Sequence, residues 1–245
     1  MTRPADERPH NGSEQPGWVE AWLFDLVQQD VSLGVSIEFL LWPVERRVAF
    51  HTSLVRPGEP LVSLVELEAA APKPPSLEVR APGLWTDIGV QTPLEHMTVD
   101  LEAFAVALDE PADVFAGAYG IRLPLGGELE WESAAPIQAG STADSYEIPC
   151  IVHGELLVGD EVLEIDGWGW RSHRWGVAAP TDRARIRGRT RSGIWFNESD
   201  IGRELTMEVL GAAPVPDPSL VRAHLHQHLA RNDNGDAAWI RRVVT

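Results

Sequence analysis

The side chains best suited to chemistry lie between Gly167 and Gly176, where one histidine, two arginines and three tryptophans are interspersed with three glycines. His173 is the one side chain of this stretch that exchanges a proton near neutral pH. A general acid that protonates an apolar molecule needs a dry pocket, with aromatic faces that stabilise the developing positive charge. The stretch therefore indicates acid chemistry on a hydrophobic substrate, although a packed corner between two sheets would use the same residue types.

The strand face on which each residue lies decides which side chains accompany His173. Alternate residues of an extended strand share a face, which places Arg171 and Trp175 beside His173. We expect the other aromatic residues of the stretch to line the pocket as well, and Trp131 either to join them or to lie in the core. The residues predicted to bind substrate are Trp168, Trp170, Arg171, Trp175 and Trp131.

A second group of ionisable residues lies in the first half of the chain. Glu95 and His96 are adjacent, and Glu102 has the same strand parity as His96. A carboxyl group held in an apolar wall can act as a general acid. We therefore predict a catalytic set of His173, Glu95, His96 and Glu102, against the alternative that the last three lie in water at strand ends.

Three histidines at alternate positions, His224, His226 and His228, offer a different chemistry. On a strand they share one face, and two of them with a distant ligand would suit iron, zinc or copper. All three cannot easily reach one ion, because the outer two lie about 13 Å apart. A metal-dependent β-barrel enzyme built on His224 and His226 is thus an alternative. We expect a solvated histidine face instead, and predict no metal or other cofactor.

The composition excludes several partners. Lysine and arginine number 20 against 37 acidic residues, and the net charge of −17 repels nucleic acid and anionic membranes. Cys150 is the one cysteine, which leaves no intramolecular disulfide and no paired-cysteine metal site. The N-terminus lacks a secretory signal, and no apolar run approaches the roughly 18–20 residues of a membrane span. We expect a cytoplasmic protein without membrane insertion, whose partner is a small hydrophobic substrate. The sequence allows a homodimer but does not predict one.

Short strands must position these residues. Residues 32–39 alternate polar and apolar side chains, as a half-buried strand does, and similar segments follow along the chain between turn residues. The alternation over Met97–Leu108 favours a strand despite its alanines, and Asn234-Gly235 predicts the turn of the last hairpin. Many short strands with regular turn signals predict an all-β fold of the sandwich or barrel type.

Two breaks in the pattern predict the domain organisation. Residues 1–16 are polar without periodicity and are expected to form a disordered leader. Pro136–Asp144 is rich in small and turn residues and is typical of a linker. We therefore predict an N-terminal β unit at 17–137 and a C-terminal β unit at 138–245.

The stretch from Glu155 to Gly176 resembles a signature of the lipocalin-like carotenoid 1,2-hydratase (hydroxyneurosporene synthase) superfamily. That signature is often written G-x-G-x-R-D-H-S-W-G in bacterial relatives of unknown function. Here Ser172 replaces the aspartate and Arg174 replaces the small residue before tryptophan. Residues 92–96 and 127–132 also resemble the N-terminal domain of these relatives, and the resemblance spans roughly residues 18–200.

The resemblance implies two lipocalin-like β-barrel or sandwich units packed together, with a hydrophobic cavity near their junction. It also implies cofactor-independent hydration, dehydration, isomerisation or cyclisation of a terpenoid or polyketide-like molecule. His173 would act as the acid or the orienting group, and Trp175 would accompany it. The missing aspartate at Ser172 leaves a second interpretation open, in which the protein carries a small apolar ligand without transforming it.

Overall fold

The computed structural model describes residues 2–10, 15–117, 120–140, 142–177, 184–199, 206–218 and 224–244. Strands dominate the described chain, and the predicted all-β fold is confirmed. Two short 3-10 helices, η1 (Pro4–Glu7) and η2 (Pro111–Ala116), accompany the strands. Within the described ranges, no helix has the length and apolar character required to cross a membrane.

The larger of two antiparallel sheets has 11 strands, and nearly all of them follow the order β4-β3-β2-β1-β11-β10-β8-β7-β6-β5, with β9 paired to β10. The strands are β1 (Val19–Gln28), β2 (Gly34–Trp42), β3 (Arg47–Val55), β4 (Leu61–Ala70), β5 (Val79–Ala81), β6 (Leu84–Thr92), β7 (His96–Leu108), β8 (Ile121–Ser133), β9 (Gln138–Ala139), β10 (Ser145–Val158) and β11 (Glu161–Gly176).

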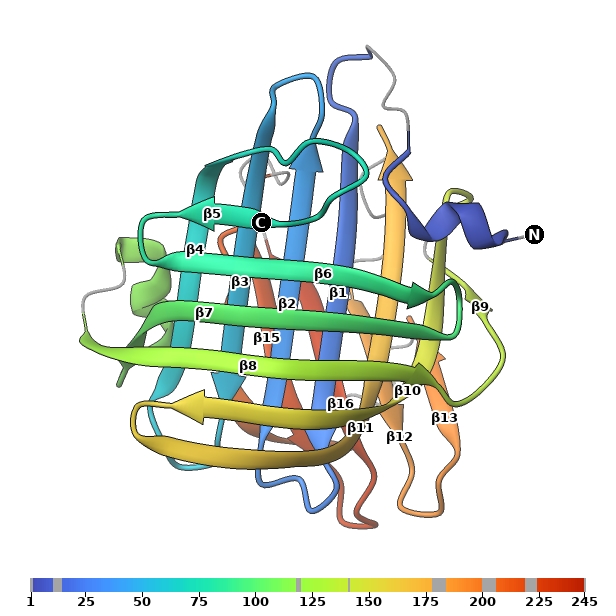
Figure 1. Ribbon diagram of the computed structural model, residues 1–245. Coiled ribbons are helices and arrows are strands. Elements are labelled where there is room, and N and C mark those ends of the chain that lie inside the picture. The colour runs from blue at the N-terminus through green and yellow to red at the C-terminus, as the bar shows by residue number, and fades with distance from the viewer. Residues whose placement is uncertain are drawn as a thin grey trace.

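The larger sheet closes on itself, because residues 61–63 of β4 also pair with residues 106–108 of β7. In Figure 1 the strands β5 to β8 run across the strands β1 to β4, so the closed sheet has two crossed layers. Side chains alternate as a strand requires: Met97, Val99 and Leu101 of β7 are buried in the core between the layers. The strand predicted over 97–108 is therefore confirmed.

The smaller sheet has five strands in the order β13-β12-β16-β15-β14 and lies behind β1 to β4 in Figure 1. Its strands are β12 (Ala184–Arg189), β13 (Trp195–Glu198), β14 (Glu208–Ala212), β15 (His224–Arg231) and β16 (Ala237–Val244). Val27, Trp168 and Trp239 belong to the apolar cluster between the two sheets. The Arg187 guanidinium also lies 2.8 Å from the Asp25 carboxylate across this interface.

Strand β11 connects the two layers of the closed sheet. Residues 161–166 pair with β10, whereas residues 167–176 pair with β1 and most of them also with β10. The glycines of the signature make this possible. A Cβ atom on Gly167 would lie 2.4 Å from the Val27 carbonyl oxygen, and one on Gly169 would lie 1.8 Å from the Asp25 carbonyl oxygen. Only glycine permits so close an approach of the two backbones.

The predicted boundary at 137/138 is wrong. β10 and β11 belong to the same closed sheet as β1 to β8, and β11 pairs directly with β1. The first β unit therefore extends to Gly176, and the smaller sheet begins at Ala184. The polar segment near residue 140 is a connection inside the first unit, because residues 146 and 147 of β10 pair with the short strand β9.

The predicted disorder of the leader is wrong for residues 2–10. This segment contains η1, and the side chains of Asp6 and Glu7 are buried against the closed sheet. Its polar residues carry no periodic signal, because they are held by partners distant in the sequence rather than by a local apolar stripe. Figure 1 shows the segment lying beside β10 and β11 at one end of the crossed layers. Residues 11–14 lie outside the described part of the chain.

Candidate active site

His173 lies at the centre of a row of side chains that crosses three strands. In the register of the sheet, His173 of β11 is opposite Trp22 of β1 on one side and Tyr146 of β10 on the other. The Trp22 and His173 rings stack, with centroids 4.2 Å apart and planes inclined by 17°. Trp175, two residues farther along, faces the same interior. His173 is only 1% exposed, so its ring is shielded from water by aromatic surfaces.

Both ring nitrogens of His173 face oxygen atoms. Nε2 lies 2.9 Å from a carboxylate oxygen of Glu20, which comes from β1. Nδ1 lies 2.7 Å from the backbone carbonyl oxygen of Asp6, in the N-terminal segment. A carbonyl oxygen only accepts, so Nδ1 carries a hydrogen. An ionised carboxylate also only accepts, so both ring nitrogens of His173 face acceptor oxygens.

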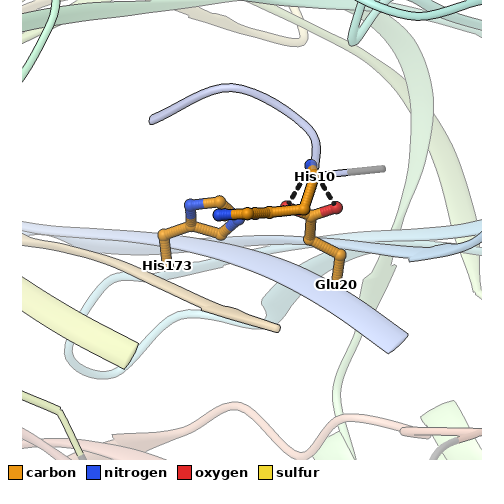
Figure 2. Close-up of side chains that lie close together, drawn as sticks. All are labelled: His10, Glu20 and His173. Atoms are coloured by element: carbon orange, nitrogen blue, oxygen red, sulfur yellow. Dashed lines mark hydrogen bonds and ion pairs between the residues drawn. The ribbon is translucent and has the colours of Figure 1, made fainter. Parts of the chain in front are cut away.

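Glu20 is fully buried. Figure 2 shows His10 and His173 lying close to it, and both contact its carboxylate. The same carboxylate accepts hydrogen bonds from the backbone N–H of His10, and the His10 Nδ1 atom lies 2.6 Å from it. Burial alone would raise the pKa of Glu20, but the hydrogen bonds from His10 and His173 outweigh it and lower that pKa. Glu20 is therefore held as an anion between the two histidine rings.

Arg171 lies two residues before His173 on the same face of β11 and meets a second acid from the N-terminal segment. Its Nη1 atom lies 2.5 Å from a carboxylate oxygen of Glu7. The hydroxyl group of Tyr146 donates to the same oxygen at 2.5 Å. Burial, followed by the negative charge of Glu7, raises the pKa of Tyr146 well above its usual value. The Tyr146 hydroxyl therefore stays protonated and acts as a donor.

The N-terminal segment separates this buried cluster from an open cleft. The cleft has a volume of about 760 Å³, and its lining includes Asp6, His10, Ile137, Ser145 and Trp175. His10 stacks on Trp175 with ring centroids 4.1 Å apart. Below the segment, the gap between Trp22 and Arg171 has an empty volume of about 150 Å³ and does not admit a water-sized sphere. The position beside His173 Nδ1 is occupied by the Asp6 carbonyl group of the segment.

Two of the predicted pocket residues lie elsewhere. Trp168 and Trp170 occupy the opposite face of β11 from His173, and both contact Trp195 of the smaller sheet edge to face. They pack between the two sheets and do not line the interior of the closed one. The prediction rests on how many tryptophans the stretch contains, whereas strand parity separates Trp168 and Trp170 from Trp175.

Trp131 is a core residue. Its ring packs on Phe24 at 5.1 Å, and its Nε1–H donates to the Asp25 carbonyl oxygen at 3.1 Å. It is fully buried in the same apolar cluster as Trp22. Of the five residues predicted to bind substrate, only Arg171 and Trp175 lie with His173.

The predicted acids of the first half are not brought to His173. Glu95 is exposed in the turn before β7, and Glu102 is exposed on the outer face of the sheet. His96 on that face lies 3.1 Å from Glu130. The interior neighbour on this strand is Met97, whose sulfur lies 3.2 Å from the Arg171 Nη1 atom. The placement of Glu95, His96 and Glu102 in a catalytic set with His173 is therefore wrong, because parity points His96 and Glu102 away from the core and Glu95 lies in the turn before β7.

Two groups of side chains in the described residues could hold a metal ion, and neither contains His224, His226 or His228. One group is His96, Glu130 and Glu132 on the outer face, and the other is His10, Glu20 and His173. In the second group, the nitrogen–oxygen distances of 2.6 and 2.9 Å are those of hydrogen bonds. Two ligands at about 2.0–2.1 Å from a tetrahedral zinc ion would lie roughly 3.3 Å apart. The spacing of this group fits shared protons better than a metal ion.

The residues that the sequence does not predict are those that meet His173 and Arg171 from other elements: Asp6, Glu7, His10, Glu20 and Tyr146. One of them, Glu20, could have been identified from the sequence pattern. Glu20 shares its strand parity with Trp22, so an acid on the buried face of an apolar strand is visible in the sequence. The partners in residues 6–10 give no such signal, because that segment has no periodic pattern.

A family model described as a domain of unknown function (DUF7064) matches residues 3–197. No curated protein matches the sequence. Among solved structures the chain is similar to NE1406, a candidate AttH protein from Nitrosomonas europaea, with a TM-score of 0.58 and 11% identity over 100% of this chain and 96% of that one. This likeness concerns the fold alone.

Two further solved structures have lower TM-scores. CghA with Sch210972 has a TM-score of 0.45 and 13% identity, over 95% of this chain and 62% of that one. Kievitone hydratase from Nectria haematococca has a TM-score of 0.44 and 12% identity, over 91% of this chain and 63% of that one. The chain thus spans less than two thirds of the length of either protein.

Proposed function

Because the chain belongs to the DUF7064 family, a domain of unknown function, we propose its function from its own geometry. We infer a cofactor-independent enzyme that transfers a proton to a small hydrophobic molecule and so catalyses hydration or dehydration, isomerisation or cyclisation. Each of these reactions can start from protonation of a double bond, a hydroxyl or a carbonyl group.

The observation that carries this proposal is the environment of His173. A proton donor must hold its proton in a dry site and release it to the substrate when the substrate arrives. His173 is buried, its Nε2–H is held by Glu20 at 2.9 Å, and its ring is stacked on Trp22. The Glu20 carboxylate stabilises the imidazolium and fixes the orientation of the ring, as a carboxylate does for the histidine of a hydrolase triad.

The reacting atom is Nδ1 of His173, because Nε2 is engaged by Glu20. In this structure the Nδ1–H group donates to the carbonyl oxygen of Asp6. A substrate that replaces the N-terminal segment would present its own basic atom at this position. The proton moves from Nδ1 to the substrate, and the faces of Trp22 and Trp175 stabilise the resulting cation. In a hydration, water then adds to the cation, and its surplus proton returns to Nδ1.

A solvent-isotope assay tests this function over a panel of candidate substrates. Isoprenoid and polyketide-like alkenes and enones are incubated with the protein in D₂O, and mass spectrometry detects products that gain deuterium at carbon or the mass of water. The His173→Gln variant should lose this activity by at least about a hundredfold, as is typical of removal of a general acid. The Glu130→Gln variant, altered on the outer face, should retain it.

Two outcomes would contradict the proposal. Undiminished turnover by His173→Gln would show that the histidine supplies no proton. Compounds that bind but are always recovered unchanged would favour the alternative of a non-catalytic carrier for a small apolar ligand.

A further inference from the structure

The second acid of the N-terminal segment, Glu7, occupies a receptor for a carboxylate. We propose that Arg171 and Tyr146 form the binding site for the carboxylate group of the ligand, and that Glu7 fills this site as an internal substitute when no ligand is present. The ligand would thus be an apolar molecule that carries a carboxylate, and the N-terminal segment would be the group that it displaces.

Glu7 does not satisfy all the hydrogen-bond donors of Arg171. One Glu7 oxygen accepts from both the Tyr146 hydroxyl and the Arg171 Nη1 atom. The other oxygen, and the Nε and Nη2 atoms of Arg171, are buried without a hydrogen-bond partner in the structure. A guanidinium group binds a carboxylate best through two parallel hydrogen bonds, which use both oxygens. A free carboxylate that is not tethered to the chain can adopt this arrangement.

Stability alone gives a weak reason to bury this ion pair. Arg171 is 2% exposed and Glu7 is fully buried. Replacement of a buried ion pair by apolar residues of similar volume is often neutral or stabilising, because the desolvation of two charges is costly. A cationic group kept in the interior beside Met97 and Tyr146 is instead what recognition of an anionic ligand requires.

The segment that carries Glu7 can leave without breaking a sheet. In the described part of the chain, residues 2–10 contribute no strand to either sheet, and their one element is a 3-10 helix of four residues. Their hydrogen bonds to the closed sheet come from the side chains of Glu7 and His10 and from the backbone groups of Asp6 and His10. The family match begins at residue 3, so this segment is part of the domain.

The segment also indicates the shape of the ligand. The carbonyl group of Asp6 lies at the proton donor His173, and the side-chain carboxylate of Glu7 lies at Arg171. Along the covalent chain, the N, Cα, Cβ and Cγ atoms of Glu7 separate these two groups. A carboxylic acid with a carbonyl group at this separation, such as 6-oxoheptanoate, would satisfy both sites. The His173 half of this assignment rests on the proposed function, whereas the Arg171 half does not.

Calorimetric titration of the full chain with matched compounds tests the receptor. The probes are 6-oxoheptanoate, heptanoate, which lacks the ketone, and 2-heptanone, which lacks the carboxylate. The Glu7→Gln variant should bind both carboxylates about tenfold or more tightly than the unmodified chain, because a neutral amide competes less well for Arg171. The control variant Glu68→Gln, altered at an exposed side chain, should bind as the unmodified chain does. 2-Heptanone should gain little from Glu7→Gln.

Substitutions of Arg171 and Tyr146 should weaken the binding of carboxylates. Arg171→Gln should abolish the preference for heptanoate over 2-heptanone, and Tyr146→Phe should weaken heptanoate binding several-fold with less effect on folding. Circular dichroism shows whether Arg171→Gln folds. If it does not fold, the binding of heptanoate by Tyr146→Phe tests the proposal. Equal binding of heptanoate and 2-heptanone to Glu7→Gln, or no binding of either carboxylate, would overturn the proposal. Tight carboxylate binding without any turnover would instead contradict only the proposed function.

Discussion

The Glu20→Gln substitution tests the assignment of the site most directly, because it removes one charge and almost no volume. Glu20 is fully buried and is linked to His173 Nε2 at 2.9 Å and to His10 Nδ1 at 2.6 Å. Both rings face the same Glu20 oxygen, Oε1, and the His10 backbone N–H also reaches the other oxygen. A glutamine would offer the rings a neutral oxygen, which is a weaker acceptor than a carboxylate, and would place an NH₂ donor against the His10 N–H. Loss of a hydrogen bond to a charged group costs about 1.5–3 kcal/mol, and we expect the unfolding free energy to fall by that amount near pH 6.

The pH dependence of this loss gives a sharper test. Burial raises the pKa of Glu20, but hydrogen bonds from His10 and His173 lower it below the usual value of a glutamate. A carboxyl group whose folded-state pKa is depressed stabilises the protein above its unfolded-state pKa, and this contribution is lost as the pH falls through the folded-state pKa. The stability difference between the unmodified chain and Glu20→Gln should therefore be complete above about pH 5 and shrink below about pH 4.

Urea unfolding, followed by tryptophan fluorescence at pH values from about 3 to 6, measures this difference across the window in which a glutamate titrates. Glu68→Gln is the matched control, because its exposed side chain should show almost no effect at any pH. The melting temperature of Glu20→Gln near pH 6 should fall by about 3–12 °C, given roughly 2–4 °C per kcal/mol for a chain of this size. A Glu20→Gln variant as stable as the unmodified chain near neutral pH, or a difference that persists unchanged in acid, would refute the assignment of Glu20 as a buried anion.

Three further predictions concern Gly169 in β11, the Cys150 thiol and the effect of removing divalent metal ions. Gly169→Ala should abolish folding or lower the urea midpoint severely, because its Cβ would lie 1.8 Å from the Asp25 carbonyl oxygen; Gly58→Ala, with open space around a φ of +80°, should cost only about 1 kcal/mol. Burial raises the pKa of Cys150 to about 12, so iodoacetamide at about pH 8 should label it only after denaturation, and rapid labelling of the native chain would contradict its burial. Removal of divalent metals with EDTA should leave proton transfer by His173 unchanged, whereas restoration of a lost activity by zinc would favour the metal-centre interpretation of His10, Glu20 and His173.

The strands and the face on which each residue lies can be predicted from the sequence. The period-two pattern predicts β7, and parity correctly places Arg171 and Trp175 on the face of His173. The prediction for Trp168 and Trp170 is wrong because it follows the number of aromatic residues rather than that parity. The local pattern contains enough information to place both tryptophans on the other face.

The residues that contact His173 cannot be predicted from local sequence patterns. Glu20 and Asp6 are separated from it by more than 150 residues, and only the pairing of β1 with β11 and the docking of the N-terminal segment bring them together. The composition of residues 1–16 resembles that of a disordered leader, because the buried acids Asp6 and Glu7 are as polar as exposed ones. Burial of such residues depends on partners such as Arg171, which no window of neighbouring residues contains.

The serine at position 172 bears on whether the site can be catalytic at all. The signature that residues 155–176 resemble has an aspartate at this position, and a serine in its place favours a carrier without chemistry. Residue 172, however, lies on the opposite face of β11 from His173, and the Ser172 hydroxyl accepts from Arg187 of the smaller sheet at 3.4 Å. A carboxylate at position 172 would therefore lie at the interface between the two sheets and not beside the histidine ring. The acid that contacts His173 in this chain comes from β1, as Glu20, so a serine at 172 does not remove the charge on which the proposed proton transfer depends.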